Sequence, residues 1–179
     1  MTTHPQVQLI FGAGGIGEGT ITHAWTTSEQ TSELLDVLKE LQITELDSAA
    51  SSPPGSPRVS ERLLGESRAA GKGFVIDTKI ERTAISGGLS GVAIDSSLKK
   101  SLELLDVKQC NILYAHFPDP NTPVEESARA FDNHYRAGLF KEVHPQLTIT
   151  FWASNNFVAW LMQSLLRASE RMVASLQET

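Results

Sequence analysis

Asp47, Lys79 and His116 each stand at the end of a short apolar run that is typical of a β-strand, and a helical pattern follows each run. In a parallel barrel the carboxyl ends of the strands open on one mouth, so these three side chains would meet there. A lysine in such a desolvated mouth can act as a base or form an imine, and a histidine beside it can carry protons. The three residues therefore predict one shared chemical site at this mouth. Alternatively, the three residues are inherited and have no current chemical role; a structural pair between Lys79 and Asp47 is compatible with both interpretations.

Strand and helix patterns alternate along the chain that carries these side chains. The predicted strands are 7–11, 43–47, 74–78 and 111–116. The predicted helices are 28–41, 60 to the glycines at 71 and 73, about 94–105, and 123 to about 136. A fifth unit is predicted from a β-like run at 147–152 and a helical run at 158–176. Strict alternation predicts an α/β fold with a parallel sheet and helical crossovers, in one domain over 1–179.

The composition limits the classes of protein to consider. A length of 179 residues, with 40% hydrophobic and 20% charged residues, suits one globular domain with a sizeable core. The net charge of −6, with no basic cluster, argues against nucleic acid or an anionic membrane as the main partner. We find no signal peptide and no apolar run of membrane-spanning length, so we expect a cytoplasmic protein.

Several other ionisable residues are interpreted as structural. Cys110, the one cysteine, opens an apolar strand, so we expect a buried thiol in a reducing compartment and no intrachain disulfide. Asp77 projects from the opposite side of its strand to Thr78 and is expected to be solvated or paired. The remaining histidines considered share no metal-ligand spacing, so no metal site is predicted; they are His23, His134 and His144.

A glycine-rich run at 12–17 fits the pattern G-x-G-x-x-G and follows a strand. In a dinucleotide-binding fold a helix opens inside that motif and receives the pyrophosphate at its N-terminus. Here the convincing helix starts only near Ser28, and Glu18 would set a negative charge beside the phosphate. The next acid at a strand end is Asp47, about thirty residues beyond Gly17, where the fingerprint needs roughly twenty. We therefore interpret the glycines as a flexible βα loop.

Four motifs in order carry a family resemblance: LDSA at 46–49, SERLLG at 60–65, TK at 78–79 and YAHFPD at 114–119. Together they are similar to the aldo-keto reductases, and the branch they resemble is the aflatoxin-aldehyde reductase type with its fungal members. The resemblance is clear up to residue 143, and residues 144–179 form a divergent C-terminal segment.

The resemblance implies a (β/α)8 barrel that reduces aldehydes and ketones with NADPH, using an aspartate, a tyrosine, a lysine and a histidine. Asp47, Lys79 and His116 match three of these, and Ser52 stands at the position expected for the tyrosine. In the family's chemistry the tyrosine hydroxyl gives a proton to the carbonyl oxygen, and the lysine lowers its pKa. Asn156 keeps part of a motif that contacts the nicotinamide amide.

The chain departs from the family at Ser52, because a serine hydroxyl is a far poorer acid than a phenol near neutral pH. It also has about half the length of a family member, so we expect an incomplete (β/α)8 barrel of four to five βα units. Three functions stay open: altered or impaired NADPH-dependent reduction, a non-redox isomerase, cyclase or lyase that uses Lys79 and His116, and an inactive remnant or partner of a full-length relative. The expected partners are a small carbonyl-containing metabolite and a second copy, bound through the open barrel face.

Overall fold

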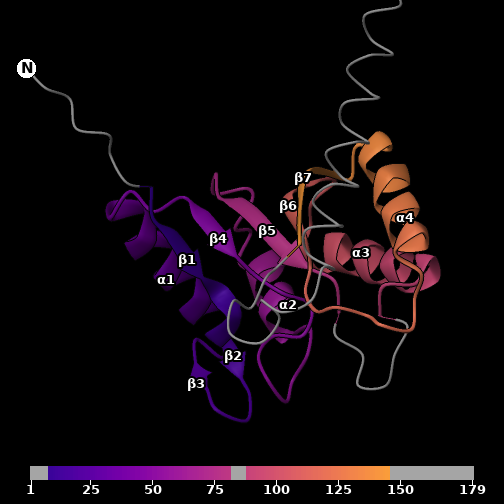
Figure 1. The fold of residues 1–179 in the computed structure, drawn as a ribbon. Helices are drawn as coiled ribbons and strands as arrows, with labels where there is room; N and C mark the ends of the chain where they lie inside the picture. Colours follow the sequence, from indigo (N-terminus) through magenta and orange to yellow (C-terminus); the bar gives the residue numbers. More distant parts are fainter. Residues whose placement is uncertain (1–7, 82–87, 146–179) are drawn as a thin grey trace, which may run out of the picture.

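The computed structural model describes residues 8–81 and 88–145, and its centre is a five-stranded parallel sheet (Figure 1). The strand order is β1-β4-β5-β6-β7, which is also the order along the chain. The strands are β1 Ile10–Gly12, β4 Glu45–Asp47, β5 Val75–Lys79, β6 Cys110–Ala115 and β7 Phe140–Pro145. Each is parallel to its neighbour, which confirms the predicted α/β fold with helical crossovers.

Four α-helices connect the strands. They are α1 Ser28–Glu40, α2 Val59–Glu66, α3 Gly91–Leu105 and α4 Val124–Arg136. Neighbouring helices pack on one another in chain order, α1 on α2, α2 on α3 and α3 on α4, so they form one layer, as in a barrel wall (Figure 1). A short 3-10 helix, η1 Ala13–Gly15, and a small antiparallel hairpin of β2 Gly17–Glu18 and β3 His23–Ala24 lie between β1 and α1.

The helix ends follow local chemistry. The hydroxyl of Thr27 accepts a hydrogen bond from the Gln30 amide at the start of α1, and Ser90 caps α3 in the same way. In α4, two glutamates lie in the first turn while His134 and Arg136 lie in the last, which suits the helix dipole. α2 ends at Glu66, earlier than the glycines at 71 and 73 predict, because the chain turns after Ser67.

Two apolar clusters fill the space between the sheet and the helices. The first lies under β4 and β5 and includes Leu35, Leu38, Leu46, Leu63, Leu64 and Ile76. The second lies under β5 to β7 and includes Ile80, Ile94, Leu98, Leu113, Phe131 and Phe140. Leu46, Ile76 and Leu113 lie on the side of the strands that faces the helices, so the residues between them along each strand project from the opposite face of the sheet.

The fifth strand is not where the sequence predicted it. β7 runs from Phe140 to Pro145, directly after the turn at Gly138, and pairs with β6 along its length. Its sequence, FKEVHP, lacks the alternation of a half-buried strand, because two adjacent charged residues separate the buried Phe140 from Val143. The β-like run predicted at 147–152 and the helical run at 158–176 lie outside the described residues.

Candidate functional site at the carboxyl ends of the strands

Asp47 and Lys79 are the last residues of the neighbouring strands β4 and β5. The Lys79 ammonium donates hydrogen bonds to the Asp47 carboxylate and, over 2.7 Å, to the Ser48 carbonyl oxygen. Its Nζ also lies 5.2 Å from the centroid of the Tyr114 ring. The Lys79 side chain is 7% exposed and that of Asp47 is 36% exposed, so the pair sits at the border between the sheet and solvent. The structure therefore brings two of the three predicted residues into direct contact.

His116 follows β6 at the same end of the sheet. β6 pairs with β5 so that Tyr114 stands opposite Lys79, and His116 comes two residues after Tyr114. Its ring lies 4.7 Å from that of Phe117, measured between centroids. Asp47 and Lys79 thus end β4 and β5, and His116 directly follows β6, so all three lie at the carboxyl ends of successive strands.

Ser52 belongs to the loop between β4 and α2. Its amide donates to the Ala49 carbonyl, and its own carbonyl accepts from the Ser60 amide at 3.2 Å, so the loop is tied to the first turn of α2. The serine is largely buried, and its hydroxyl oxygen would be 3.4 Å from a Cβ placed on Gly14. The hydroxyl therefore lies against η1, after β1.

The environment of Tyr114 does not suit it to replace the proton-donating tyrosine that the family resemblance implies. Burial is the first cause that raises its pKa, and the charges of the nearby carboxylates raise it further. A catalytic phenol needs a lowered pKa, which an ammonium beside its oxygen supplies. Here Lys79 lies over the ring instead.

The face of the sheet away from the helices is acidic. Paired residues share a face, and by this register Glu45, Asp47, Asp77 and Glu142 project on the side that carries Lys79. Burial is the main cause that raises the pKa of the Glu45 carboxyl, followed by the charge and the hydrogen bond of Asp77. We call this side of the sheet the inner face; Lys79 is the one lysine or arginine that the described strands place on it.

Asp77 is paired as expected, but it is also fully buried. Its Oδ1 accepts hydrogen bonds from the Asn111 side chain at 2.9 Å and from the Ile112 amide at 3.0 Å. Its Oδ2 is buried without a hydrogen-bond partner among the described residues. The negative charge of Asp77 disfavours a second charge nearby, which agrees with the raised pKa of Glu45.

The loop after β1 does not have the dinucleotide-binding geometry. Within the described residues 8–81, the glycine run forms η1 and the first strand of the hairpin, and the first α-helix begins at Ser28. Gly17 has a φ of +104° and packs against Val59 of α2. The run therefore makes a hairpin seated on α2, where the sequence suggested only a flexible loop.

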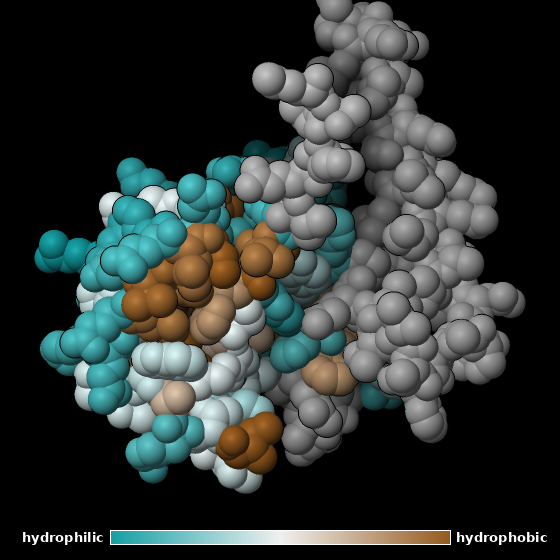
Figure 2. Space-filling view, turned by 90° about the vertical axis from the view of Figure 1, so that its left-hand side faces the viewer, coloured by the Kyte–Doolittle hydropathy of each residue, from teal (hydrophilic) through white to brown (hydrophobic). Residues whose placement is uncertain are grey.

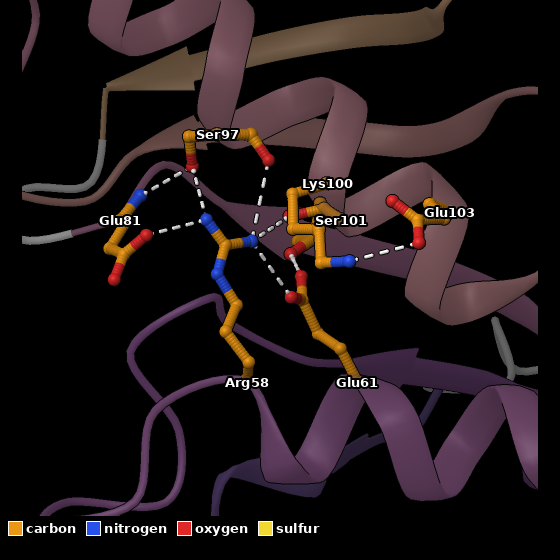
Figure 3. A network of polar contacts seen from close by, with 8 residues as sticks. Arg58, Glu61, Glu81, Ser97, Lys100, Ser101 and Glu103 are labelled. Carbon is orange, nitrogen blue, oxygen red and sulfur yellow. Dashed lines mark hydrogen bonds and ion pairs between the residues drawn. The ribbon is translucent and has the colours of Figure 1, made fainter.

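A buried network around Arg58 was missed by the sequence reasoning (Figure 3). The guanidinium lies between two carboxylates, donating to Glu61 at 3.0 Å and to Glu81 at 2.6 Å. It also donates to the hydroxyls of Ser97 and Ser101 on α3, at 3.2 and 2.8 Å. The signal in the sequence was Glu61 inside the apolar face of a helix, because a buried charge needs a partner.

The same network reaches the strand of Lys79. Glu61 is fully buried, and its Oε1 accepts a 2.6 Å hydrogen bond from the hydroxyl of Thr78, the residue before Lys79. Arg58 itself has a φ of +72°, and its amide donates to the carbonyl of Ala50 in the β4–α2 loop. The network therefore fixes α2, α3 and the end of β5 relative to one another.

Comparison with known proteins adds to this geometry. The profile of the Aldo/keto reductase family matches residues 8–177, nearly the whole chain. The chain belongs to the aldo/keto reductase family. The oxidoreductase sirO of Leptosphaeria maculans is 34% identical over 145 residues, which is 78% of this chain and 43% of sirO. The aldo-keto reductase pigE of Monascus ruber is 24% identical over 173 residues, covering 91% of this chain and 47% of pigE.

The solved structures agree on the fold of this aldo/keto reductase chain. The thermostable aldo-keto reductase Tm1743, whose structure was solved with the inhibitor epalrestat, superposes with a TM-score of 0.64 at 24% identity. The match covers 80% of this chain and 50% of Tm1743. The chain therefore has the architecture of an incomplete barrel and spans about half the length of the relatives that it matches.

Two further observations concern the described residues alone. No helix among them is both long and apolar enough to cross a bilayer. Their histidine, cysteine and carboxylate side chains form no group of three or more that could hold a metal ion. Asn156, the residue predicted to contact the nicotinamide, lies outside the described residues.

Proposed function

We propose that this chain carries the carbonyl-binding part of an aldo-keto reductase site and that its substrate is a small carbonyl-containing metabolite. The proposal rests on the position of the Lys79 ammonium, which Asp47 and Ser48 hold at the carboxyl end of β5. A fixed ammonium stabilises the negative charge that grows on a carbonyl oxygen as the carbonyl carbon is attacked. His116, at the same edge, would orient the oxygen.

The same residues support altered reductase chemistry. A reduced carbonyl needs a proton on its oxygen, and the family resemblance assigns that proton to a tyrosine. Ser52 stands at this position, with its hydroxyl against Gly14. A serine hydroxyl loses its proton far less readily than a phenol, so proton transfer would be slow near neutral pH. We therefore expect substrate binding with slow or absent turnover.

The described residues do not fit the phosphates of NADPH. Phosphate groups need cationic side chains or helix N-termini that face the site. On the inner face Lys79 is the one lysine or arginine of the described strands and is already paired with Asp47, while Glu45, Asp77 and Glu142 would repel an anion.

Two titrations test the proposal. In the first, a panel of small aldehydes and ketones is titrated against the full chain, and binding is followed by NMR of the carbonyl compounds. We expect Lys79→Met to abolish binding, while Lys99→Met, which changes an exposed lysine of α3 paired with Asp95, leaves it unchanged. Equal binding by the parent chain and Lys79→Met would contradict the proposal.

The second titration adds NADPH and follows quenching of tryptophan fluorescence. We expect no saturation at micromolar cofactor, because the described face lacks cations for the phosphates. Saturation in that range would show that other residues supply the phosphate contacts, and it would revive full reductase chemistry despite Ser52.

A non-redox reaction is the second candidate. Two observations favour it, because the carboxylates of the inner face would repel the phosphates of NADPH and Ser52 is a poor proton donor for carbonyl reduction. Here the Lys79 ammonium would give up a proton, its neutral amine would add to the carbonyl carbon, and the carbonyl oxygen would leave as water to form an imine, with His116 carrying the protons. Borohydride reduction would trap such an imine as a stable mass increase on the chain. We expect the mass increase to be lost in Lys79→Ala; an increase that persists in this variant would exclude Lys79 as its site.

A further inference from the structure

The Arg58 guanidinium is tied to the chain on both sides of Lys79. It donates to Glu61, which also accepts a hydrogen bond from the hydroxyl of Thr78, the residue before Lys79. The same guanidinium donates at 2.6 Å to Glu81, two residues after Lys79 (Figure 3). The segment that carries the ammonium is therefore held from two directions through one guanidinium.

Arg58 also holds the loop that receives the ammonium. The Lys79 ammonium donates to the Ser48 carbonyl at 2.7 Å, and the Lys79 carbonyl accepts from the Ala50 amide at 3.2 Å. The Ala50 carbonyl in turn accepts from the Arg58 amide at 2.9 Å. Both the side chain and the main chain of the lysine are thus bonded to residues 48–50, and Arg58 bonds the same stretch.

Helix α3 anchors the guanidinium. The guanidinium donates to the hydroxyl of Ser101 at 2.8 Å, and to the hydroxyl and carbonyl oxygens of Ser97 at 3.2 and 3.3 Å. The Ser97 hydroxyl also accepts from the Glu81 amide, at 2.8 Å. A planar fork of donors can serve these acceptors together with two carboxylates, whereas a lysine ammonium has three donors on one atom. Arg58 therefore connects the position of α3 to that of Lys79.

The Lys79 ammonium depends on such support. A lysine side chain loses much rotamer freedom when it is ordered, so it stays in one place only if its acceptors are fixed. The Asp47 side chain that accepts from it is 36% exposed, and the other acceptor is the Ser48 carbonyl of the loop. The contacts of Arg58 fix that loop and the end of β5 together.

We propose that Arg58 is a positioning residue for Lys79. It locks residues 78–81 and the loop at 48–50 against α3, so that the ammonium points to one place at the carboxyl end of β5. The chemical consequence of this position rests on the proposed function, but the position itself does not. The deciding measurement therefore uses no substrate, and the two ideas can fail separately.

The test is heteronuclear NMR of the lysine ammonium groups in the isotopically labelled full chain. An ammonium held by fixed acceptors exchanges its protons with water more slowly than an exposed one, and Lys79→Met identifies its signal by the loss. Arg58→Lys keeps a positive charge beside Glu61 but removes the planar fork of donors. In this variant the Lys79 protons should exchange about tenfold faster or more, the effect of losing one hydrogen bond to a charged group.

Two controls separate positioning from a general loosening of the fold. The Lys72 ammonium, which donates to Ser32 and Asp36 of α1, should give a second slow signal remote from the network. General loosening would accelerate both lysines, whereas a positioning role accelerates Lys79 alone. Arg62→Lys, which changes an exposed pair on the same helix as Arg58, should alter neither signal.

An exposed apolar surface offers a rival explanation for a slow ammonium. Apolar side chains gather over β1 and α1 (Figure 2), where Ile10, Val37 and Leu41 are exposed. Self-association, which the sequence led us to expect, could shield the ammonium from water. Val37→Lys should weaken an association through this surface, and we expect it to leave the Lys79 exchange rate unchanged.

Three results would overturn the inference: a parent chain whose Lys79 ammonium exchanges as fast as the exposed Lys99, an exchange rate that Arg58→Lys leaves unchanged or raises equally for Lys72, and an equal acceleration in Val37→Lys. Circular dichroism checks the folding of each variant. If Arg58→Lys unfolds the chain, Glu81→Gln carries the test with the same expected result, because Glu81 is 40% exposed and its change leaves the Arg58–Glu61 pair in place.

The carbonyl titration of the parent chain keeps the two ideas distinct. No binding of any carbonyl compound, together with faster Lys79 exchange in Arg58→Lys, would contradict the proposed function and support the positioning role. Binding by the parent chain with an unchanged exchange rate in Arg58→Lys would support the proposed function and refute the positioning role.

Discussion

Replacing Arg58 by alanine tests whether the buried network holds this part of the fold together. The substitution removes the guanidinium from between Glu61 and Glu81 and leaves the fully buried Glu61 carboxylate with the Thr78 hydroxyl as its hydrogen-bond donor. Removing one partner of a buried ion pair costs about 3–5 kcal/mol.

The expected loss is a large share of the free energy of unfolding, which for a domain is about 5–15 kcal/mol. Urea unfolding followed by circular dichroism at neutral pH measures it. Arg62→Ala is the matched control, because Arg62 forms a half-exposed pair with Glu66 on the same helix and should cost no more than about 0.5 kcal/mol. A loss below about 1 kcal/mol in Arg58→Ala would refute the reasoning, since a buried charge left unpaired cannot be so cheap.

Three further predictions concern single positions. Gly65→Ala should destabilise the chain by several kcal/mol in urea unfolding, because its Cβ would stand 1.9 Å from the Leu104 carbonyl oxygen, whereas Gly15→Ala, with nothing within 4 Å, should be close to neutral. Folding raises the pKa of Glu45 and so stabilises its protonated form, and this stability is lost as pH rises from the unfolded pKa through the folded one. Glu45→Gln should therefore exceed the parent in stability at pH above this window, with the advantage vanishing below it; an equal advantage in acid would contradict the assignment. Burial raises the pKa of Cys110 to about 12, so a thiol reagent at mildly alkaline pH should label it only after unfolding, and labelling of the folded chain would be the contrary result.

The sequence predicted the elements whose side chains repeat in a simple pattern. Leu34, Leu35 and Leu38 define the side of α1 that packs on the core. The apolar runs that end at Asp47 and Lys79 form β4 and β5. A repeating pattern of polar and apolar residues is a local property, so it can be recognised in the sequence without knowledge of the fold.

The missed features depend on contacts between distant residues. β7 is a strand because β6 lies beside it, although its own residues include Lys141, Glu142 and His144. Arg58 is separated from Ser97 by 39 positions, and no local pattern links them. The position of the Ser52 hydroxyl against Gly14 likewise depends on how two loops meet.

The agreement between strand order and chain order has a consequence for how the chain folds. Each βα unit packs on the unit made just before it, so its strand and helix find their partners in chain that has already been synthesised. Such a topology suits folding during synthesis, when the amino-terminal part emerges first. The buried members of the first apolar cluster lie between residues 13 and 105, so a nascent chain could bury them before β6 leaves the ribosome.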